Sequence, residues 1–272
     1  MPELPEVETV ARQLDPLAGG QLIRGVEILD SLLAFSQEKR LIGRRINQVR
    51  RIGKEVVFQL EDPRGKASDL LLAVHLRMTG RLIYQGESDC SERGDKYLRA
   101  VLKLEQGRVR FHDMRRFGTM KLYESEAEAQ PAGAEPLDRG FNADSIGELI
   151  RGSSMEIKVW LLRQDRICGI GNIYASEILH DCGIDPFRPA SSLNEDELGL
   201  LAASTKKILR KAIKHCGTTF SDFQNANGEV GGYQKYLRVY QHSGEGCRHC
   251  GTEILRAVQA QRSTFWCPAC QR

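Results

Sequence analysis

The sequence predicts an α+β protein with a β-rich N-terminal part, a helical middle and a short C-terminal cysteine module. Short β-like runs separated by tight turns fill residues 22–123, a pattern typical of an antiparallel sandwich or barrel. Helical periodicity dominates residues 145–216. Two cysteine pairs then lie between Cys247 and Cys270, in a segment too short for a large hydrophobic core of its own.

The chain opens with Met1-Pro2-Glu3-Leu4-Pro5-Glu6. Removal of Met1, which a small residue such as Pro2 permits, leaves a secondary amine. A terminal amine has a pKa of about 7.7–8.0, against about 10.4 for lysine, so part of it is unprotonated at neutral pH. Such an amine can attack a sugar C1′ or an aldehyde and form an iminium. Glu3 and Glu6 could then move protons, or the stretch could be an ordinary acidic start to a helix.

Apolar spacing predicts a helix over residues 6–17, ended by Gly19-Gly20. The β-like runs that follow are 56–60, 70–76, 81–84, 98–104, 108–111 and 120–123. Residues 124–140 have no apolar periodicity and predict a linker. Helices are expected over 145–151, 154–164, 172–182 and 193–216, then a polar glycine-rich stretch over 218–232 and a return to β structure at 237–240.

Charge is unevenly distributed along the 272 residues. The net charge is +3, yet residues 205–272 hold 11 Lys and Arg against 4 Asp and Glu. A basic end on a nearly neutral chain favours a polyanionic partner, although a solvated charged face gives the same count. Residues 1–20 lack the pattern of a secretory signal, and no apolar run is long enough for a membrane span. We therefore expect a reducing, cytosolic setting and no membrane partner.

The C-terminal module reads Cys247-x2-Cys250-x16-Cys267-x2-Cys270. Two such pairs predict a closed, tetrahedral four-thiolate site for one structural Zn²⁺, with a disulfide pairing as the alternative. Metal binding would supply much of the folding free energy of so small a module. His249, between two ligands, is expected to face solvent, and Arg262 is expected near a hairpin tip.

Two further groups of residues could contact a nucleic acid. Cys168-Gly169-Ile170-Gly171-Asn172 opens a helix, where Asn172 could serve as the N-cap and the free N–H groups could hold a phosphate near Lys158. A plain turn between helices is the alternative. The turns at 75–80 and 113–118 carry Met and Phe wedges and an arginine that could enter a base stack. Alternatively, Met78 and Phe117 are core residues, and Arg115 and Lys54 are ordinary surface residues.

Taken together, the motifs resemble those of bacterial formamidopyrimidine-DNA glycosylases, which excise 8-oxoguanine. The resemblance spans the whole chain and rests on segments that occur in family order: 2–9, 75–80, 113–118, 133–137, 169–177 and the cysteine module. Leu4 favours this branch over the endonuclease VIII branch, which usually has glycine there. The family pattern is broken at Tyr97 and Arg99, where a histidine pair is common. It is also broken at Glu55 and at Ser153-Ser154.

The resemblance implies a role for each matched residue. Pro2 would form the Schiff base, Glu3 would handle a proton at the sugar ring oxygen, and Glu6 would support the site. Lys54 would grip a phosphate and assist β-elimination, and Arg262 would hold a phosphate and serve δ-elimination. The implied DNA-binding residues are His75, Met78, Tyr97, Arg99, Arg115, Phe117, Lys158, Gly171, Asn172 and Tyr240. Among them, Met78, Arg115 and Phe117 would fill the gap left by an extruded nucleotide.

The expected organisation is an N-terminal antiparallel β-sandwich catalytic domain over 1–130 and a helix–two-turn–helix DNA-binding domain over 131–220. A lesion-capping loop over 221–236 and a zinc finger over 237–272 complete it. The expected function is excision of oxidised purines from damaged double-stranded DNA by a cytosolic bacterial monomer, with strand cleavage by β,δ-elimination. Two rivals stay open: an endonuclease VIII-type enzyme for oxidised pyrimidines, and a non-catalytic zinc protein that binds DNA.

Overall fold

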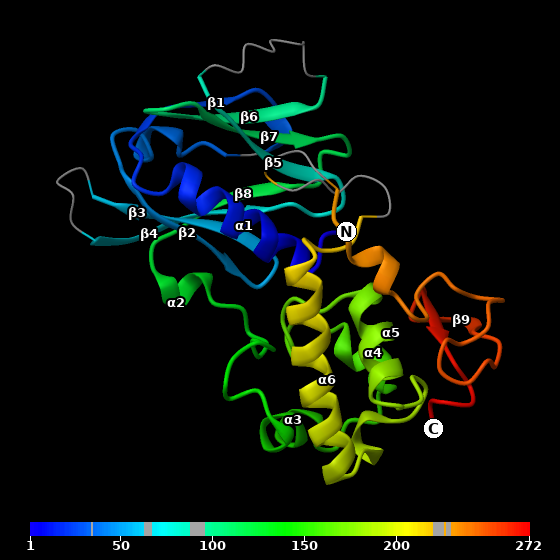
Figure 1. Cartoon of the computed structure of the whole chain (residues 1–272). Helices are drawn as coiled ribbons and strands as arrows, with labels where there is room; N and C mark the ends of the chain where they lie inside the picture. Colours follow the sequence, from blue (N-terminus) through cyan, green and yellow to red (C-terminus); the bar gives the residue numbers. More distant parts are fainter. Residues whose placement is uncertain (34, 63–66, 88–95, 220–225, 227–229) are drawn as a thin grey trace. The chain divides into compact units, whose positions relative to one another are not determined.

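The structure is a computed structural model of the chain, and it describes residues 1–33, 35–62, 67–87, 96–219, 226 and 230–272 (Figure 1). The chain divides into two compact units. The first unit contains Met1–Gln130 and His215–Gln234, and the second contains Pro131–Lys214 and Lys235–Arg272. Much of the lesion-capping loop expected over 221–236 lies outside the described residues.

The first unit is a β-sandwich with one long helix, as the sequence predicts. Helix α1 (Leu4–Ala18) precedes two four-stranded antiparallel sheets, ordered β1-β6-β7-β5 and β2-β3-β4-β8. The strands are β1 (Ile23–Ile28), β2 (Ile46–Ile52), β3 (Glu55–Glu61), β4 (Ala67–His75), β5 (Gly80–Gln85), β6 (Leu98–Leu104), β7 (Arg108–Asp113) and β8 (Thr119–Tyr123). The 3₁₀ turns η1 (Ser31–Leu33) and η2 (Glu38–Arg40) separate β1 from β2, and α2 (Glu126–Ala129) follows β8.

One hydrophobic core joins α1 to both sheets. Val7, Val10 and Leu14 on α1 are fully buried, and they belong to the same cluster as Phe58 on β3 and Phe111 on β7. The predicted helix face therefore covers the sandwich, and α1 runs along it in the view of Figure 1. This packing fixes the start of α1, and with it Pro2 and Glu3, on a rigid element.

The sequence reading missed two strands, β1 and β2. Both are edge strands, one in each sheet. Strand β1 contains Gly25, and β2 reads Ile-Asn-Gln-Val-Arg-Arg-Ile, so neither has a continuous apolar run or a clean period-two alternation. The six runs that were predicted all form strands, including β5 and β8 at the other edge of each sheet.

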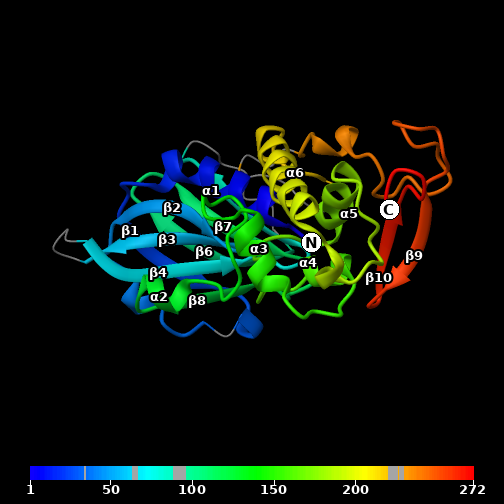
Figure 2. The ribbon, with the colours of Figure 1, turned by 90° about the horizontal axis from the view of Figure 1, so that it is seen from below.

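The second unit is helical and ends in a β-hairpin. Its helices are α3 (Ala143–Ile150), α4 (Ile157–Leu161), α5 (Asn172–Asp181) and α6 (Glu195–Lys214), with the 3₁₀ turn η3 (Ala190–Ser192) before α6. A further 3₁₀ turn, η4 (Tyr233–Tyr236), begins in the first unit and ends in the second. Strands β9 (Leu255–Gln259) and β10 (Arg262–Trp266) pair antiparallel near the C-terminus (Figure 2). No helix within the described residues is long and apolar enough to span a membrane.

Three local predictions were wrong. The linker expected over 124–140 contains α2, whose N-cap Ser125 accepts a hydrogen bond from the Glu128 N–H. The helix expected over 154–164 is only the five residues of α4. Residues 237–240 form no strand, because the N–H groups of Arg238, Val239 and Tyr240 all donate to the Glu177 carboxylate instead of a β ladder.

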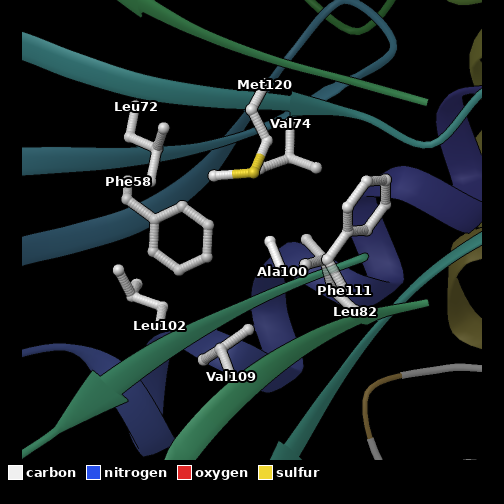
Figure 3. A pocket seen from close by; sticks show the side chains of 9 residues that line it. All are labelled: Phe58, Leu72, Val74, Leu82, Ala100, Leu102, Val109, Phe111 and Met120. Carbon is white, nitrogen blue, oxygen red and sulfur yellow. The ribbon is translucent and has the colours of Figure 1, made fainter. Parts of the chain in front are cut away.

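A cavity inside the sandwich is lined only by apolar side chains, among them Phe58, Leu102 and Met120 (Figure 3). Ala100 also lines it, and a valine there would add two methyl groups beside this space. We expect Ala100→Val to raise the unfolding free energy by about 0.5–1 kcal/mol, as cavity-filling changes commonly do. Leu102→Ala on the same wall should lower it by about 2–5 kcal/mol. Urea unfolding followed by circular dichroism measures both, and a loss of stability in A100V would contradict the prediction.

Candidate functional site

The first unit buries two carboxylates beside Pro2. Glu3 is 3% exposed and Glu6 is 1% exposed, although both are acidic. The backbone N–H of Glu3 donates to Glu6 Oε2 at 2.8 Å. The Glu6 carboxylate therefore fixes the extended residue that directly follows Pro2, at the positive end of α1.

The same carboxylate also binds a segment more than two hundred residues later. Thr218 donates its N–H to Glu6 Oε1 at 2.7 Å. The preceding Gly217 has φ +75°, and a Cβ there would lie 2.7 Å from Glu6 Oε1, so only glycine fits. Sequence reasoning missed this partner, because a backbone donor so distant along the chain leaves no local pattern.

Lys54 lies in the tight turn between β2 and β3. It is only 8% exposed, so the alternative that it is an ordinary surface lysine is wrong. Arg51 links this turn to α1: its guanidinium donates to Glu8 Oε2 at 2.9 Å and to the Gly53 carbonyl at 2.9 Å. The turn that carries Lys54 is therefore connected through Arg51 to α1, the helix that follows Pro2.

His75 ends β4, opposite Glu55 on β3. Burial, with the nearby charges of Arg77 and Lys54, lowers the pKa of His75 to about 4, so its ring is neutral at pH 7. Its Nδ1 accepts a hydrogen bond from the Arg77 N–H at 3.0 Å. Burial raises the pKa of Glu55, whose carboxylate accepts a hydrogen bond from the Tyr123 hydroxyl at 3.2 Å. The unusual Glu55 thus has a partner within the sandwich.

Met78, Arg115 and Phe117 form one exposed group, here called the wedge cluster. Met78 is 42% exposed and Phe117 is 52% exposed, so the alternative that they are core residues is wrong. An Arg115 guanidinium N–H lies 3.4 Å from the Met78 sulfur, and the guanidinium lies 4.8 Å from the centre of the Phe117 ring. The β4–β5 and β7–β8 turns therefore present a sulfur, a cation and an aromatic ring side by side.

Two aspartates hold the β7–β8 turn. Asp113 is 1% exposed and accepts hydrogen bonds from the N–H groups of Arg115 and Gly118, at 3.2 and 2.7 Å, and from the Thr79 hydroxyl. Arg116 has φ +59°, a left-handed backbone that turns its side chain to Asp30, which it meets with Nε 2.7 Å from Oδ2. The strained residue separates Arg115 from Phe117 while both stay exposed.

Removing the Asp30 charge should weaken this turn in a pH-dependent way. Hydrogen bonds from Arg116 lower the pKa of Asp30 from 3.8 to about 2. The stabilisation is therefore complete above pH 4 and is lost as the pH falls toward 2. We expect Asp30→Asn to cost about 1–3 kcal/mol at pH 7 and progressively less between pH 4 and 2. Urea unfolding of both proteins at several pH values measures the difference, and a gap independent of pH would contradict it.

A polar constellation in the second unit centres on the Ser263 carbonyl. Asn172 Nδ2 donates to this oxygen at 2.9 Å, and Lys158 Nζ lies 3.4 Å from it. The N-cap of α5 is Gly171, with no side-chain cap, so the prediction that Asn172 caps the helix is wrong. Its amide instead joins the start of α5 to the C-terminal hairpin, and Asn172 Oδ1 is a buried acceptor with no hydrogen-bond donor in the part of the chain that the structure describes.

Arg262 begins β10 directly before Ser263, and its side chain is exposed. The hairpin turn is Ala260-Gln261, with φ values of +44° and +61°. Both angles suit glycine or asparagine better, so this tip is strained. Thr264 and Gln259 anchor the hairpin: the Thr264 hydroxyl donates to Gln259 Oε1 at 2.6 Å, and Gln259 Nε2 donates to Glu156 Oε2 at 2.7 Å.

The other predicted contacts occupy varied environments. Lys158 is fully buried, whereas Tyr97 and Tyr240 are half-buried. Arg99 Nε donates to the Asp113 carbonyl at 2.8 Å and lies 3.4 Å from Asp30 Oδ2. Tyr240 packs edge-on against Phe265, with ring centres 5.2 Å apart. Arg99 and Lys158 thus engage protein groups in this structure.

The four predicted metal ligands converge. The Sγ atoms of Cys247, Cys250, Cys267 and Cys270 all lie within 4.8 Å of one another. Individual pairs are 3.3, 3.4 and 3.9 Å apart, against about 3.8 Å expected for a tetrahedron with Zn–S bonds of about 2.3 Å. The donor set and spacing fit one structural zinc ion, and all four positions of the metal are filled by the chain. His249 is exposed, as predicted.

Comparison with known protein families finds three matching domains along the chain. Residues 1–120 match the formamidopyrimidine-DNA glycosylase N-terminal domain. Residues 132–224 match the formamidopyrimidine-DNA glycosylase H2TH domain. Residues 244–272 match a zinc finger found in FPG and IleRS. The cysteine cluster and the zinc-finger match together assign a structural zinc ion to this module.

Full-length relatives carry the same family name. The chain is 37% identical to a formamidopyrimidine-DNA glycosylase of Desulfitobacterium hafniense and 39% identical to one of Xanthomonas campestris, with 100% of each chain covered. The MutM (Fpg) protein of Thermus thermophilus has a similar structure, with a TM-score of 0.87, 35% identity and 99% and 98% of the two chains covered. Lactococcus lactis Fpg bound to DNA with an abasic site gives a TM-score of 0.88 at 33% identity, with 99% of each chain covered. The chain therefore belongs to the bacterial formamidopyrimidine-DNA glycosylase family of DNA-repair enzymes.

Proposed function

We propose that this protein removes oxidised purines, 8-oxoguanine and formamidopyrimidines, from double-stranded DNA and then cleaves the abasic strand. The observation that carries the proposal is the buried Glu6 carboxylate, which fixes Glu3 and Thr218 around Pro2. Burying a carboxylate to 1% exposure costs folding free energy, which the hydrogen bonds to Glu6 offset. Relatives named for this activity, and a Lactococcus lactis mutant solved with Fapy-dG DNA, support the substrate class.

The chemistry begins with the amine of Pro2 after Met1 has been removed. The nitrogen lone pair attacks C1′, the bond from C1′ to the base breaks, and the base leaves with that electron pair and takes up the proton that the Pro2 nitrogen loses. Glu3 gives a proton to the ring oxygen O4′ as the sugar opens, which leaves a C1′ iminium on Pro2. Glu6 acts on this step through the backbone positions it holds.

Strand cleavage follows from the iminium, which withdraws electrons from C2′. Loss of a C2′ proton forms a double bond and expels the 3′ phosphate, and a second elimination expels the 5′ phosphate. Lys54 and Arg262 are proposed to hold these phosphates, since both are cations at or directly beside a hairpin turn. Hydrolysis of the remaining imine returns free Pro2. No redox step is needed in this sequence.

Access to the sugar requires the nucleotide to leave the stack, which costs a few kcal/mol. The wedge cluster is suited to offset this cost, because Met and Phe side chains can fill a vacated space and arginine can bond the unpaired partner base. His75 and Asn172, with the helix N-terminus at Gly171, are proposed to hold backbone phosphates. Tyr97 and Tyr240 are proposed to contact DNA, and Arg99 and Lys158 to support the neighbouring segments that they bond.

Borohydride trapping tests the proposal most directly. The protein is incubated with an 8-oxoguanine:cytosine duplex and reductant, and the adduct is mapped by mass spectrometry. We expect one covalent DNA adduct on Pro2 of a chain that lacks Met1, and none with Pro2→Gly. An adduct on another residue, or cutting by P2G at the parent rate, would refute the Schiff-base assignment.

A second duplex, which contains thymine glycol, distinguishes an oxidised-purine glycosylase from an endonuclease VIII-type enzyme. We expect faster excision of 8-oxoguanine than of thymine glycol, whereas the reverse order would favour an endonuclease VIII-type enzyme. Binding without any base release would favour a non-catalytic DNA-binding protein. We further expect a monomer that acts on duplex DNA in the bacterial cytosol or nucleoid, which sedimentation of the complex and cell fractionation can check.

A further inference from the structure

Helix α5 makes a polar contact at its start, its middle and its end. At its start, Asn172 bonds the Ser263 carbonyl of the hairpin at 2.9 Å. In the middle, Glu177 accepts the three N–H groups of 238–240, the segment that leads into the zinc module. At its end, His180 Nε2 lies 3.5 Å from the sulfur of Cys247. All of these residues belong to the second unit.

The surroundings of His180 define which ring nitrogen carries the proton. The residue is 6% exposed, and its Nδ1 is a buried atom with no hydrogen bond among the described residues. A buried N–H without an acceptor is rarer in proteins than a buried acceptor without a donor. The neutral ring therefore places its proton on Nε2, directed at Cys247 Sγ.

Cys247 and Cys267 are the two buried ligands, and Cys247 is the one that lies beside the His180 ring. Four thiolates around Zn²⁺ carry more negative charge than the ion neutralises, and N–H groups next to the sulfurs reduce the cost of that excess. Cys250 is exposed, so water can donate to it from the cleft that it lines together with Cys270, His249 and His180. Cys247 is only 4% exposed.

We propose that His180 donates a hydrogen bond from Nε2 to the zinc-bound thiolate of Cys247 and so fastens the zinc ion to α5. This positioning role is independent of the proposed DNA chemistry. Helix α5 would then bind the metal site through His180 at its end and the hairpin of Arg262 and Ser263 through Asn172 at its start.

The test uses two variants of nearly equal length and volume, His180→Gln and His180→Met, on the full zinc-loaded protein. Gln retains an N–H donor near the position of Nε2, and Met does not. The first readout is the rate of zinc transfer to a colorimetric chelator. We expect H180M to release zinc about 10–100-fold faster than the parent, the effect typical of lost outer partners of metal ligands. H180Q should release it at a rate close to that of the parent.

The second readout is the sulfur-to-metal charge-transfer band of the cobalt-substituted protein. Loss of the N–H should shift this band to longer wavelength in H180M and leave it nearly unchanged in H180Q. His249→Met is the control, because His249 also lies beside a ligand but faces solvent, and it should match the parent in both readouts. Equal release rates and spectra for H180M and the parent would overturn the proposal. Equal losses in H180M and H180Q would also overturn it, since packing would then explain the effect.

Discussion

Cys267→Ser is expected to abolish zinc binding and duplex binding together. The serine hydroxyl stays protonated at neutral pH and is a poor zinc ligand, so the tetrahedral site loses one of its two buried ligands. The core of the module contains Val239, Cys247, Ile254, Phe265 and Cys267, so two of its five buried members are themselves ligands. Zinc binding in small zinc modules is worth about 10–16 kcal/mol, far more than such a core provides.

Loss of the module should then release Arg262 and the Ser263 carbonyl that Asn172 bonds. We expect zinc content to fall from one ion per chain to none, and affinity for an abasic-site duplex to fall at least about 100-fold, as for a site that loses several phosphate contacts. Metal analysis and fluorescence anisotropy at fixed salt measure both. Cys182→Ser is the control: Cys182 lies in the same unit but outside the four-sulfur cluster, and the variant should keep its zinc and its affinity. A metal-free C267S with parental affinity would show that zinc does not organise this surface.

The parts of the fold that follow from local patterns were predictable. The cysteine spacing identified all four ligands, because each pair forms a tight local turn whose geometry depends little on the rest of the chain. Six strands, β3 to β8, were predictable because each contains a short run of apolar or β-branched residues. Strands β1 and β2 were not, since polar residues and Gly25 interrupt their apolar positions.

The parts that depend on distant partners were not predictable. Residues 237–240 have the composition of a strand, yet their N–H groups bond Glu177, about sixty positions earlier. Asn172 has the right side chain for an N-cap, but the Ser263 carbonyl attracts its amide instead. In both places a tertiary acceptor outcompetes the local rule.

The residues of the candidate site were also predictable only in part: those in sequence motifs were identified, and those that act through distant contacts were not. The family motifs supplied Pro2, Glu3, Glu6 and the wedge cluster, whereas residue types alone favoured a buried Met78 and an exposed Lys54. Both preferences are statistical, and in this structure Met78 is exposed and Lys54 is buried. The sequence did not predict the roles of Asp30, Thr218 and Glu177, because each bonds a residue far away along the chain.

Glu177→Ala is expected to destabilise the second unit by at least about 3 kcal/mol. The substitution leaves the N–H groups of 238–240 without their acceptor, and each unpaired buried donor costs about 1–3 kcal/mol. Burial raises the pKa of Glu177 while the three N–H donors act against that rise, so the network and the carboxylate depend on each other. Val239 is fully buried and Tyr240 is half-buried, so their N–H groups stay poorly hydrated unless the segment moves away from α5, whereas Arg238 is exposed.

Both tryptophans, Trp160 and Trp266, lie in the second unit, so urea unfolding followed by tryptophan fluorescence reports on this unit alone. Glu177→Gln should be intermediate. Its carbonyl oxygen can replace Oε1, which takes the Val239 and Tyr240 N–H groups, but its NH₂ would face the donor of Arg238. Glu148→Ala on the exposed side of α3 is the matched control and should change stability by less than about 0.5 kcal/mol. If E177A and E148A unfolded at the same urea concentration, the carboxylate would be dispensable, and another interaction would have to hold 237–240 out of a strand.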